Sequence, residues 1–331
     1  MKLAIVEGDG IGKEVIPAAV DVLDALSLSI EKVPLELGYG KWERTGSAIT
    51  DEDLSILKEC DCILFGAITT PPDPNYKSVL LTIRKELDLY ANIRPIRPIP
   101  GITGVTGRSD FDIMIVRENT EGMYSGIEEI HHDVAYTRRV ITRKGSERIA
   151  RAACELAETR NRHLTIVHKS NVLKSDTLFL DACRDVAASY DITCDDMLVD
   201  AMAYSLISSP HQYDVVVTTN LFGDILSDMA AALVGGLGIV PSANIGDNRA
   251  FFEPVHGSAP DIAGQGIANP LAAILSVKMM LEWLGDHQDA ALIEESVCYA
   301  ISRNITTPDL GGSANTRQVG DALVDRIMHT N

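Results

Sequence analysis

The sequence KLAIVEGDGIGKEVIPAAVDVLDAL (residues 2–26) decides the expected fold class. Its first six residues form a short aliphatic and β-branched run, which predicts a buried strand. After a glycine-rich turn, apolar residues recur every three or four positions and predict a helix with one buried face: Val15, Ile16, Ala19, Val20, Leu23 and Leu26. A strand that leads into an amphipathic helix is the repeating unit of α/β proteins.

The same unit recurs along the chain. Further short apolar runs are CILFGAI (62–68), FDIMIV (111–116), HLTIVH (163–168), ITCDDMLVD (192–200) and YDVVVTT (213–219). Each of these runs is preceded or followed by a helical pattern, such as the one at 78–87. We therefore predict an α/β protein with a substantially parallel sheet.

The composition excludes several classes of protein. The 331 residues are 46% hydrophobic and carry a formal net charge of -18, so the chain can form real cores but repels nucleic acids and acidic membranes. The longest apolar stretch, 229–240, is too short to cross a membrane, and the apolar run at 3–6 is too short for a signal peptide. The six cysteines lack zinc-site spacing, which indicates reduced thiols in a cytoplasmic protein.

Two segments rich in proline and glycine, 92–107 and 234–248, divide the chain. We expect residues 96–235 to form one domain and residues 1–95 plus 236–331 to form the other, with a functional cleft between them. The segment MYSGIEEIHHDVAYTRRVITR (123–143) alternates and carries charge on both faces. It predicts either a protruding β arm or an ordinary solvated hairpin.

Two small-residue segments are candidates for cofactor contacts. The turn GDGIG (8–12) lacks the third glycine of the dinucleotide-binding fingerprint, and a tight strand-to-helix turn explains it equally well. In FEPVHGSAPDIAGQGIANP (252–270), the small residues Gly257, Ser258 and Ala259 precede Pro260 and would let the backbone approach a phosphate beside His256. An ordinary loop is the alternative.

Four cationic residues stand at apparent strand ends and loop edges: Arg84, Arg94, Arg117 and Lys169. Each alone is compatible with a surface ion pair. The carboxyl ends of strands are, however, where open α/β sheets bind ligands, and arginine binds carboxylates through two parallel hydrogen bonds. Together these residues predict a site for a small molecule with more than one carboxylate.

Three aspartates suggest a metal site. Asp200 ends the strand pattern at 194–200, and Asp224 and Asp228 share one helix face in NLFGDILSD (220–228). Hard oxygen ligands suit Mg²⁺ or Mn²⁺. The alternative is a solvated face with unrelated surface charges.

Long motifs in this sequence resemble the metal-dependent, decarboxylating 2-hydroxyacid dehydrogenases, the family of isopropylmalate, isocitrate, homoisocitrate and tartrate dehydrogenases. They span the chain: EGDGIGKEV (7–15), IRKELDLYANIRP (83–95), VRENTEGMYSG (116–126), HKSNVLKSD (168–176), TNLFGDILSD (219–228), HGSAPDIAGQGIANP (256–270) and TPDLGGSANT (307–316). The resemblance implies the family's two-domain fold, which is not a Rossmann fold. It also implies a cofactor-binding domain formed by 1–95 plus 236–331 and a metal-binding and dimerisation domain formed by 96–235.

The resemblance implies a role for each candidate residue. The arginines Arg84, Arg94 and Arg117 are similar to those that bind the malate-type carboxylates, Tyr124 to the general acid and Lys169 to the general base. Asp224 and Asp228 resemble the metal ligands of one subunit. Asp200 and Lys169 resemble residues that reach in from the neighbouring subunit, so a homodimer with composite sites is implied. The arm at about 123–143 resembles the clasp between subunits.

The resemblance also implies the cofactor. The loop His256–Ile262 and Asn269 correspond to the cofactor-binding segment, and Asn171 is similar to a residue near the nicotinamide. Asp261 matches the acidic residue that NAD-preferring members place against the adenosine ribose, and Ile262 follows it. Relatives that prefer NADP have lysine and tyrosine there. We therefore expect NAD.

The substrate is expected from the helix KSVLLTIRKEL (77–87). Leu80 and Leu81 match leucines that face the isopropyl group in isopropylmalate enzymes, and an apolar wall disfavours a third carboxylate. Lys77 and Ser78 instead suit the extra carboxylate of homoisocitrate or isocitrate. We expect isopropylmalate, with homoisocitrate as the main alternative. A non-catalytic regulatory subunit or a plain carboxylate-binding protein is disfavoured because every expected catalytic and metal-binding residue is present.

Overall fold

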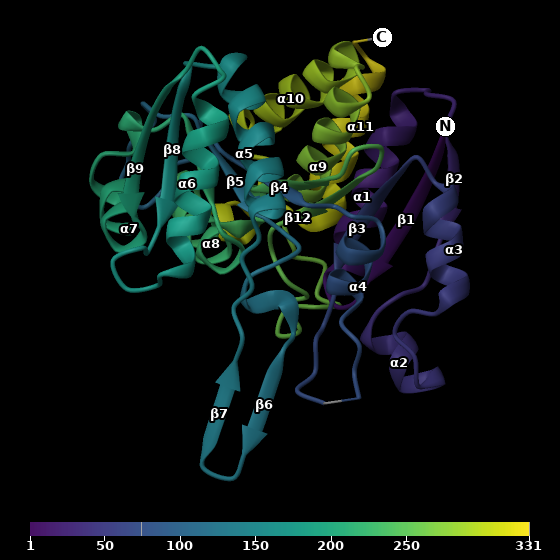
Figure 1. The fold of residues 1–331 in the computed structure, drawn as a ribbon. Coiled ribbons are helices and arrows are strands. Elements are labelled where there is room, and N and C mark those ends of the chain that lie inside the picture. The colour runs from purple at the N-terminus through teal and green to yellow at the C-terminus, as the bar shows by residue number, and fades with distance from the viewer. Residues whose placement is uncertain (74, 331) are drawn as a thin grey trace.

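The computed structural model describes residues 1–73 and 75–330, which form one ten-stranded sheet with helices on both sides and a separate two-stranded hairpin (Figure 1). The order across the sheet is β2-β1-β3-β12-β11-β4-β5-β10-β8-β9. These strands are β1 (Lys2–Gly8), β2 (Glu31–Pro34), β3 (Cys62–Ala67), β4 (Ala91–Ile96), β5 (Ile113–Glu118), β8 (His163–His168), β9 (Thr193–Leu198), β10 (Val215–Thr218), β11 (Pro241–Ile245) and β12 (Ala250–Pro254).

The sheet is parallel at both ends and antiparallel in the middle. The pairs β2–β1, β1–β3, β3–β12, β5–β10, β10–β8 and β8–β9 are parallel, whereas β12–β11, β11–β4 and β4–β5 are antiparallel. The predicted α/β class with a substantially parallel sheet is confirmed. Two of the three antiparallel pairs join strands that are consecutive in the chain without an intervening α-helix, namely β4–β5 and β11–β12, whereas parallel neighbours usually need a helical crossover.

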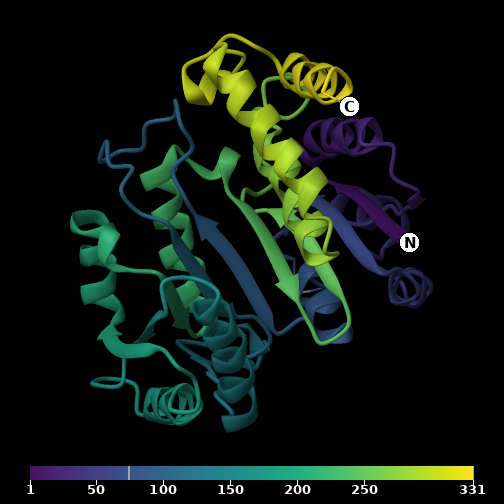
Figure 2. The same cartoon turned by 90° about the horizontal axis from the view of Figure 1, so that it is seen from above.

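Eleven helices are present in the described residues: α1 (Gly12–Ala25), α2 (Tyr39–Thr45), α3 (Asp51–Glu59), α4 (Val79–Glu86), α5 (Arg143–Glu158), α6 (Ser175–Ala187), α7 (Val199–Ser208), α8 (Asn220–Val234), α9 (Leu271–Trp283), α10 (His287–Ser302) and α11 (Thr316–Met328). Helices α1, α9, α10 and α11 pack together over one half of the sheet, and α5 and α6 pack on the other half (Figure 2). Since one sheet runs through both halves, the expected division at 96 and 236 remains a prediction.

The hairpin β6 (Glu128–His131) and β7 (Val134–Thr137) projects away from the body of the molecule (Figure 1). Its large apolar side chains are exposed, with Ile130 at 79% and Tyr136 at 58% of their full area. The segment is therefore a protruding arm in shape. At its base, Gly122 and Val140 form an antiparallel bridge that pairs the segment leading into the arm with the segment leading out of it.

Two candidate residues, Arg94 and Asp200, lie in other elements than the sequence suggested, and Arg84 lies in its predicted helix. Arg94 lies within β4, although the proline- and glycine-rich segment at 92–107 predicts a connection there. Pro95 is tolerated in this strand because the pairing of β4 with β11 ends at Ile93. Arg84 lies in the last turn of α4, within the helix predicted at 78–87. Asp200 does not end a strand, because β9 stops at Leu198 and Asp200 lies in the first turn of α7.

Two features of the structure bear on expectations drawn from the composition: the state of the cysteines and the lengths of the helices. All six cysteines are free, and Cys60, Cys62, Cys154 and Cys183 are buried. Burial raises the pKa of the Cys62 thiol to about 12, so this thiol is unreactive at neutral pH. In the described part of the chain, every helix is too short or too polar to span a bilayer.

Candidate active site

A cavity of about 340 Å³ lies where β3, β4, β5 and β12 meet α4 and α8. Ten of the residues that the sequence singled out line it: Ser78, Leu80, Leu81, Arg84, Arg94, Arg117, Tyr124, Asp224, His256 and Gly257. They come from segments separated by as much as half of the chain. The fold therefore brings together the predicted carboxylate-binding arginines, the general acid and one metal ligand.

Helix α4 presents two leucines and an arginine to this cavity. The Ser78 hydroxyl accepts a hydrogen bond from the Leu81 N–H at 3.4 Å and so caps the helix. Leu80 and Leu81 follow in the first turn, and Arg84 lies on the same face three to four residues later. The Lys77 side chain is exposed and lies outside the cavity lining. The cavity thus has an apolar wall beside a buried cation.

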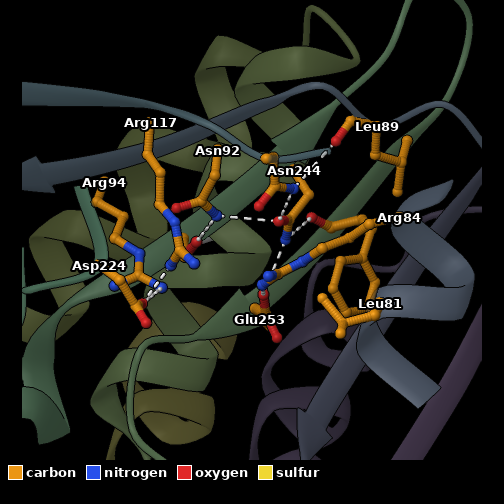
Figure 3. A network of polar contacts seen from close by, with 12 residues as sticks. Leu81, Arg84, Leu89, Asn92, Arg94, Arg117, Asp224, Asn244 and Glu253 are labelled. Carbon is orange, nitrogen blue, oxygen red and sulfur yellow. Dashed lines mark hydrogen bonds and ion pairs between the residues drawn. The ribbon is translucent and has the colours of Figure 1, made fainter. Parts of the chain in front are cut away.

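Arg94 and Arg117 point from neighbouring strands toward Asp224 of α8 (Figure 3). Arg94 Nη1 donates to Asp228 Oδ1 at 3.0 Å, and its Nη2 lies 3.5 Å from Asp224 Oδ1. Arg117 pairs with Asp224 Oδ1 and donates from Nη2 to Asn220 Oδ1 at 2.8 Å. The two aspartates on one helix face are therefore partly neutralised from β4 and β5.

A glycine lets α8 approach β5 this closely. A Cβ atom at Gly223 would lie 2.6 Å from the Cβ and Cγ atoms of Arg117. Any larger residue would push the helix away from the strand. The glycine in NLFGDILSD is therefore part of the site's construction.

The carboxyl groups of α8 differ in their electrostatics. Burial raises the pKa of the Asp228 carboxyl in spite of the nearby Arg94 guanidinium. Burial also acts to raise the pKa of Asp224, but the Arg117 guanidinium and a hydrogen bond from Tyr124 outweigh it and lower that pKa. Asp224 is thus the more firmly ionised member of the pair.

The Tyr124 side chain contacts both Asp224 and Arg117. Its hydroxyl donates to Asp224 Oδ2 at 2.5 Å, and its ring centroid is 5.2 Å from the Arg117 Cζ. Burial and the hydrogen bond to Asp224 both raise the pKa of the Tyr124 hydroxyl. The hydroxyl therefore keeps its proton at neutral pH, which is the state that a proton donor needs.

A buried polar network behind the arginines was missed by sequence reasoning. Arg84 Nη2 and Asn244 Nδ2 both donate to Glu253 Oε1 at 2.9 Å. Asn244 Oδ1 accepts from Asn92 Nδ2 at 3.0 Å and from Asn119 Nδ2 at 2.8 Å (Figure 3). These asparagines are at most 1% exposed. The available signal was asparagine and glutamate inside apolar strand patterns, where a buried polar side chain needs partners.

The expected cofactor loop packs on the first glycine-rich turn. Ser258 O accepts from the Ile11 N–H at 2.9 Å, and Thr69 Oγ1 donates to Ser258 Oγ at 2.8 Å. Gly10 has φ of 56°, and a Cβ atom there would lie 2.0 Å from Ser258 O. GDGIG therefore forms a tight turn that supports the loop, and the dinucleotide fingerprint reading is replaced by this packing role.

The other loop residues have different environments. Burial lowers the pKa of His256, whose ring lines the cavity. Pro260 and Asp261 are exposed, and Ala259 and Ile262 are half-buried. Asn269 is buried; its Nδ2 donates to Asp309 Oδ2 and its Oδ1 accepts from the Leu271 N–H, both at 3.0 Å. The amide therefore holds α9 against the segment that carries Asp309.

Lys169, Asp200 and Asn171 lie outside the cavity of this chain. Lys169 follows β8, and its ammonium group pairs with Asp200 at the start of α7. The hydrogen bond and charge of Lys169 lower the pKa of Asp200. Asn171 is exposed in the same loop as Lys169. One chain therefore does not unite the predicted general base and third aspartate with Asp224.

The donor set of α8 was tested against a divalent metal. Asp224 and Asp228 offer two carboxylates at the spacing of one helical turn, and hard oxygen donors suit Mg²⁺ and Mn²⁺. Within the described part of one chain, no group of three His, Cys, Asp or Glu side chains could hold a metal. The donors fit such an ion, and the set needs further oxygens from a partner subunit, a substrate or water.

The chain matches proteins of one family over nearly its whole length. The family model for isocitrate/isopropylmalate dehydrogenases matches residues 2–323. Homoisocitrate dehydrogenase of Methanocaldococcus jannaschii is 49% identical over 99% of this chain and 98% of that protein. The 3-isopropylmalate/3-methylmalate dehydrogenase of the same organism is 48% identical over 98% of each chain.

A solved structure gives the same result. The crystal structure of isocitrate dehydrogenase from Methylococcus capsulatus superimposes with a TM-score of 0.95 at 43% identity, and covers 99% of both chains. The expected fold is therefore confirmed by an experimental relative. The protein belongs to the isocitrate/isopropylmalate dehydrogenase family and is a decarboxylating dehydrogenase of that family.

Proposed function

We propose that this protein oxidatively decarboxylates 3-isopropylmalate to 2-oxo-4-methylpentanoate with NAD, a step of leucine biosynthesis in the cytoplasm. The observation that carries the proposal is one cavity with three buried guanidinium groups beside an apolar wall. Arg84, Arg94 and Arg117 are at most 6% exposed, and Leu80 and Leu81 line the same cavity. A malate with an apolar substituent at C3 matches both features.

The arginines would bind the carboxylates of the substrate. Arg84 Nε and Arg94 Nε are buried and lack a hydrogen-bond partner within the described residues. Buried donors without partners are costly, and a bound carboxylate would satisfy such groups. The arginines would also orient C2 and C3 of the substrate toward Tyr124.

Two side chains would move protons. Lys169 of a partner subunit would take the proton of the C2 hydroxyl, and Tyr124 would return a proton to C3 after the carboxylate has left. The raised pKa of Tyr124 suits a donor. When bound, NAD would accept the hydride and Mg²⁺ or Mn²⁺ would supply Lewis-acid polarisation of the C2 oxygen.

Charge balance supports a divalent ion at Asp224 and Asp228. In and beside the cavity, three guanidinium groups face three carboxylates, those of Asp224, Asp228 and Glu253. A malate-type dianion would add two negative charges in a largely buried volume, and a divalent cation would neutralise them. We propose that Asp200 of the partner subunit completes the set of ligands.

A homodimer accounts for the residues outside the cavity. The arm exposes Ile130 and Tyr136, and α7 and α8 expose Tyr204 at 76%, Ile207 at 47% and Ile225 at 58%. Such side chains would be buried by a partner subunit that packs on the arm and on α7 and α8, and contiguous exposed apolar patches are typical of protein interfaces. A partner bound there would bring its own Lys169 and Asp200 toward the site, as the family resemblance implies.

NAD is the proposed cofactor because Asp261 is exposed on the loop that packs on GDGIG. A carboxylate there would accept hydrogen bonds from ribose hydroxyls and repel a 2′-phosphate. The variant Asp261→Lys/Ile262→Tyr should therefore shift the kcat/KM ratio toward NADP. An unchanged ratio would refute this assignment.

Homoisocitrate is the second candidate substrate. Ser78 lies at the N-terminus of α4 inside the cavity lining, and helix N-termini favour anions. Lys77 lies outside the cavity lining but adds a cation beside this helix start, and relatives of 49% and 48% identity are named for homoisocitrate and for 3-isopropylmalate/3-methylmalate. A third carboxylate bound here would change the substrate but none of the proposed catalytic residues.

The test is NADH formation with four acids, namely 3-isopropylmalate, homoisocitrate, isocitrate and malate, each with and without Mg²⁺. The proposal expects the highest kcat/KM with 3-isopropylmalate and no turnover after chelation of the metal. A higher kcat/KM with homoisocitrate would assign the second candidate. Absence of activity with all four acids would contradict the catalytic proposal as a whole.

A further inference from the structure

Arg139, where the arm returns to the body, turns its side chain inward. Its guanidinium pairs with Asp176 in the first turn of α6, and Nη1 donates to Ser175 Oγ at 2.9 Å. The Arg139 side chain is 12% exposed and that of Asp176 is 0% exposed. A carboxylate without solvent contact depends on such a partner, because an unpaired buried charge is strongly unfavourable.

The second oxygen of this carboxylate holds the backbone of the proposed general base. Asp176 Oδ2 accepts a hydrogen bond from the Lys169 N–H at 2.7 Å. Each oxygen of Asp176 therefore has its own partner, Arg139 on one side and the Lys169 main chain on the other. The position of Lys169 after β8 thus depends on a carboxylate that Arg139 orients.

The same guanidinium also contacts α8. Arg139 Nη2 donates to Thr219 Oγ1 at 3.0 Å, and its Cζ lies 5.4 Å from the centroid of the Phe222 ring. Thr219 precedes the first turn of α8, the helix that carries Asp224 and Asp228. One side chain therefore contacts both the loop that follows β8 and contains Lys169, here called the Lys169 loop, and α8, the helix of the proposed metal ligands.

We propose that Arg139, together with Asp176, is a positioning residue that fixes the Lys169 loop relative to the start of α8. This inference rests on the proposed function, in which Lys169 serves the partner's cavity while α8 serves the cavity of its own chain. The contact consequently links the two sites of the dimer. Displacing either end should disturb proton transfer more than substrate binding.

The kinetic test compares Arg139→Met with a matched control. The control is Arg160, which is also mostly buried, with a side chain 17% exposed, and whose Nε donates to the buried Asp214 at 2.8 Å. Arg160 lies at the opposite ends of β5 and β10 from the proposed site. We expect Arg139→Met to lower kcat at least about tenfold with KM for acid and NAD nearly unchanged. Arg160→Met should retain the wild-type kcat per folded enzyme.

A conservative variant separates positioning from packing. The ammonium of Arg139→Lys can reach one carboxylate oxygen but cannot bind Asp176 and Thr219 together. It should recover part of the kcat lost in Arg139→Met. A kcat within twofold of wild type for Arg139→Met, or an equal loss in Arg160→Met, would overturn the proposal.

Hydrogen exchange gives a readout that does not depend on turnover. In the intact wild-type and variant enzymes, Arg139→Met should accelerate amide exchange in both 169–176 and 219–223, whereas Arg160→Met should leave both segments unchanged. Unaltered exchange in either segment would refute the linkage. Faster exchange together with inactivity of the wild type on all four acids would sustain the linkage and remove the proposed function.

Discussion

Two polar groups of this chain carry the proposed chemistry, and they differ in how complete they are. The group of Arg94, Arg117 and Asp224 is formed within one chain, with the arginine side chains only 6% and 2% exposed. The pair of Lys169 and Asp200 is open to solvent, with side chains 25% and 63% exposed. The first group is held by the fold itself. The second group lies on the surface, where the proposed partner subunit would use it.

The strongest test of this difference uses two inactive variants, one with a defect in each group. Lys169→Met should lower kcat by about 10²–10⁴-fold through loss of the general base. Asp224→Asn should remove Mg²⁺-dependent turnover. Mixing the two after subunit exchange should restore about a quarter of the wild-type activity, because half of the dimers would then contain one intact composite site.

The control is to mix Asp224→Asn with Tyr124→Phe. Both substitutions lie in the cavity of their own chain, so in a mixed dimer each site keeps one defect. No activity should return from that mixture. If the mixture of Lys169→Met with Asp224→Asn also stayed inactive after subunit exchange, Lys169 would act in its own chain, contrary to the proposed composite site. Recovery in the control mixture would mean that Asp224 and Tyr124 do not serve the same cavity.

The two groups should also differ in how much they contribute to the free energy of unfolding. Arg117→Met leaves Asp224 without its nearest cation, and we expect a loss of about 2–3 kcal/mol in the free energy of unfolding. This is less than a fully buried pair would lose, because the Asp224 side chain is 32% exposed and Arg94 remains nearby. Lys169→Met removes only a solvated ion pair and should leave the unfolding midpoint unchanged.

Chemical unfolding followed by circular dichroism, at one protein concentration, would measure both variants. A fixed concentration is needed because the unfolding of a dimer depends on it. If Lys169→Met proved as destabilising as Arg117→Met, the exposed pair would be part of the folded scaffold. The distinction between a preformed group and a surface group would then be wrong.

Most of the fold could be predicted from the apolar periodicity of the sequence. The strand at 2–7 and the helix after it were predicted within a residue or two, since burial of one face dictates their pattern. The antiparallel centre was not predicted, because the order of strands depends on contacts between segments far apart in the chain. Arg94 was assigned to a loop for a related reason, since a proline-rich segment can still enter a strand where pairing ends.

The candidate site likewise contains residues that the sequence predicted and residues that it did not. Asp224, Arg117 and Tyr124 were found from motifs, and the structure brings them into one cavity. Glu253 and Asn244 were missed because a lone polar residue in an apolar run gives no information about its partner across the sheet. Their hydrogen bonds to Arg84 and Asn92 join residues 169 and 152 positions apart in the chain and appear only once the strands are assembled.

The smallest expected effect is the pH dependence of the Arg117 contribution. The pKa of Asp224 is lowered in the folded protein, so its pairing stabilises the fold above the ordinary carboxyl pKa of about 3.9 and this stabilisation is lost as the pH falls through the lowered value. Arg117→Met lacks most of that stabilisation at every pH. The difference in unfolding free energy between wild type and variant should therefore narrow between about pH 5 and pH 3. Unfolding curves at pH 7, 5 and 3 would measure it, and a constant difference would mean that Arg117 acts through packing against Gly223 and Tyr124 and not through its charge.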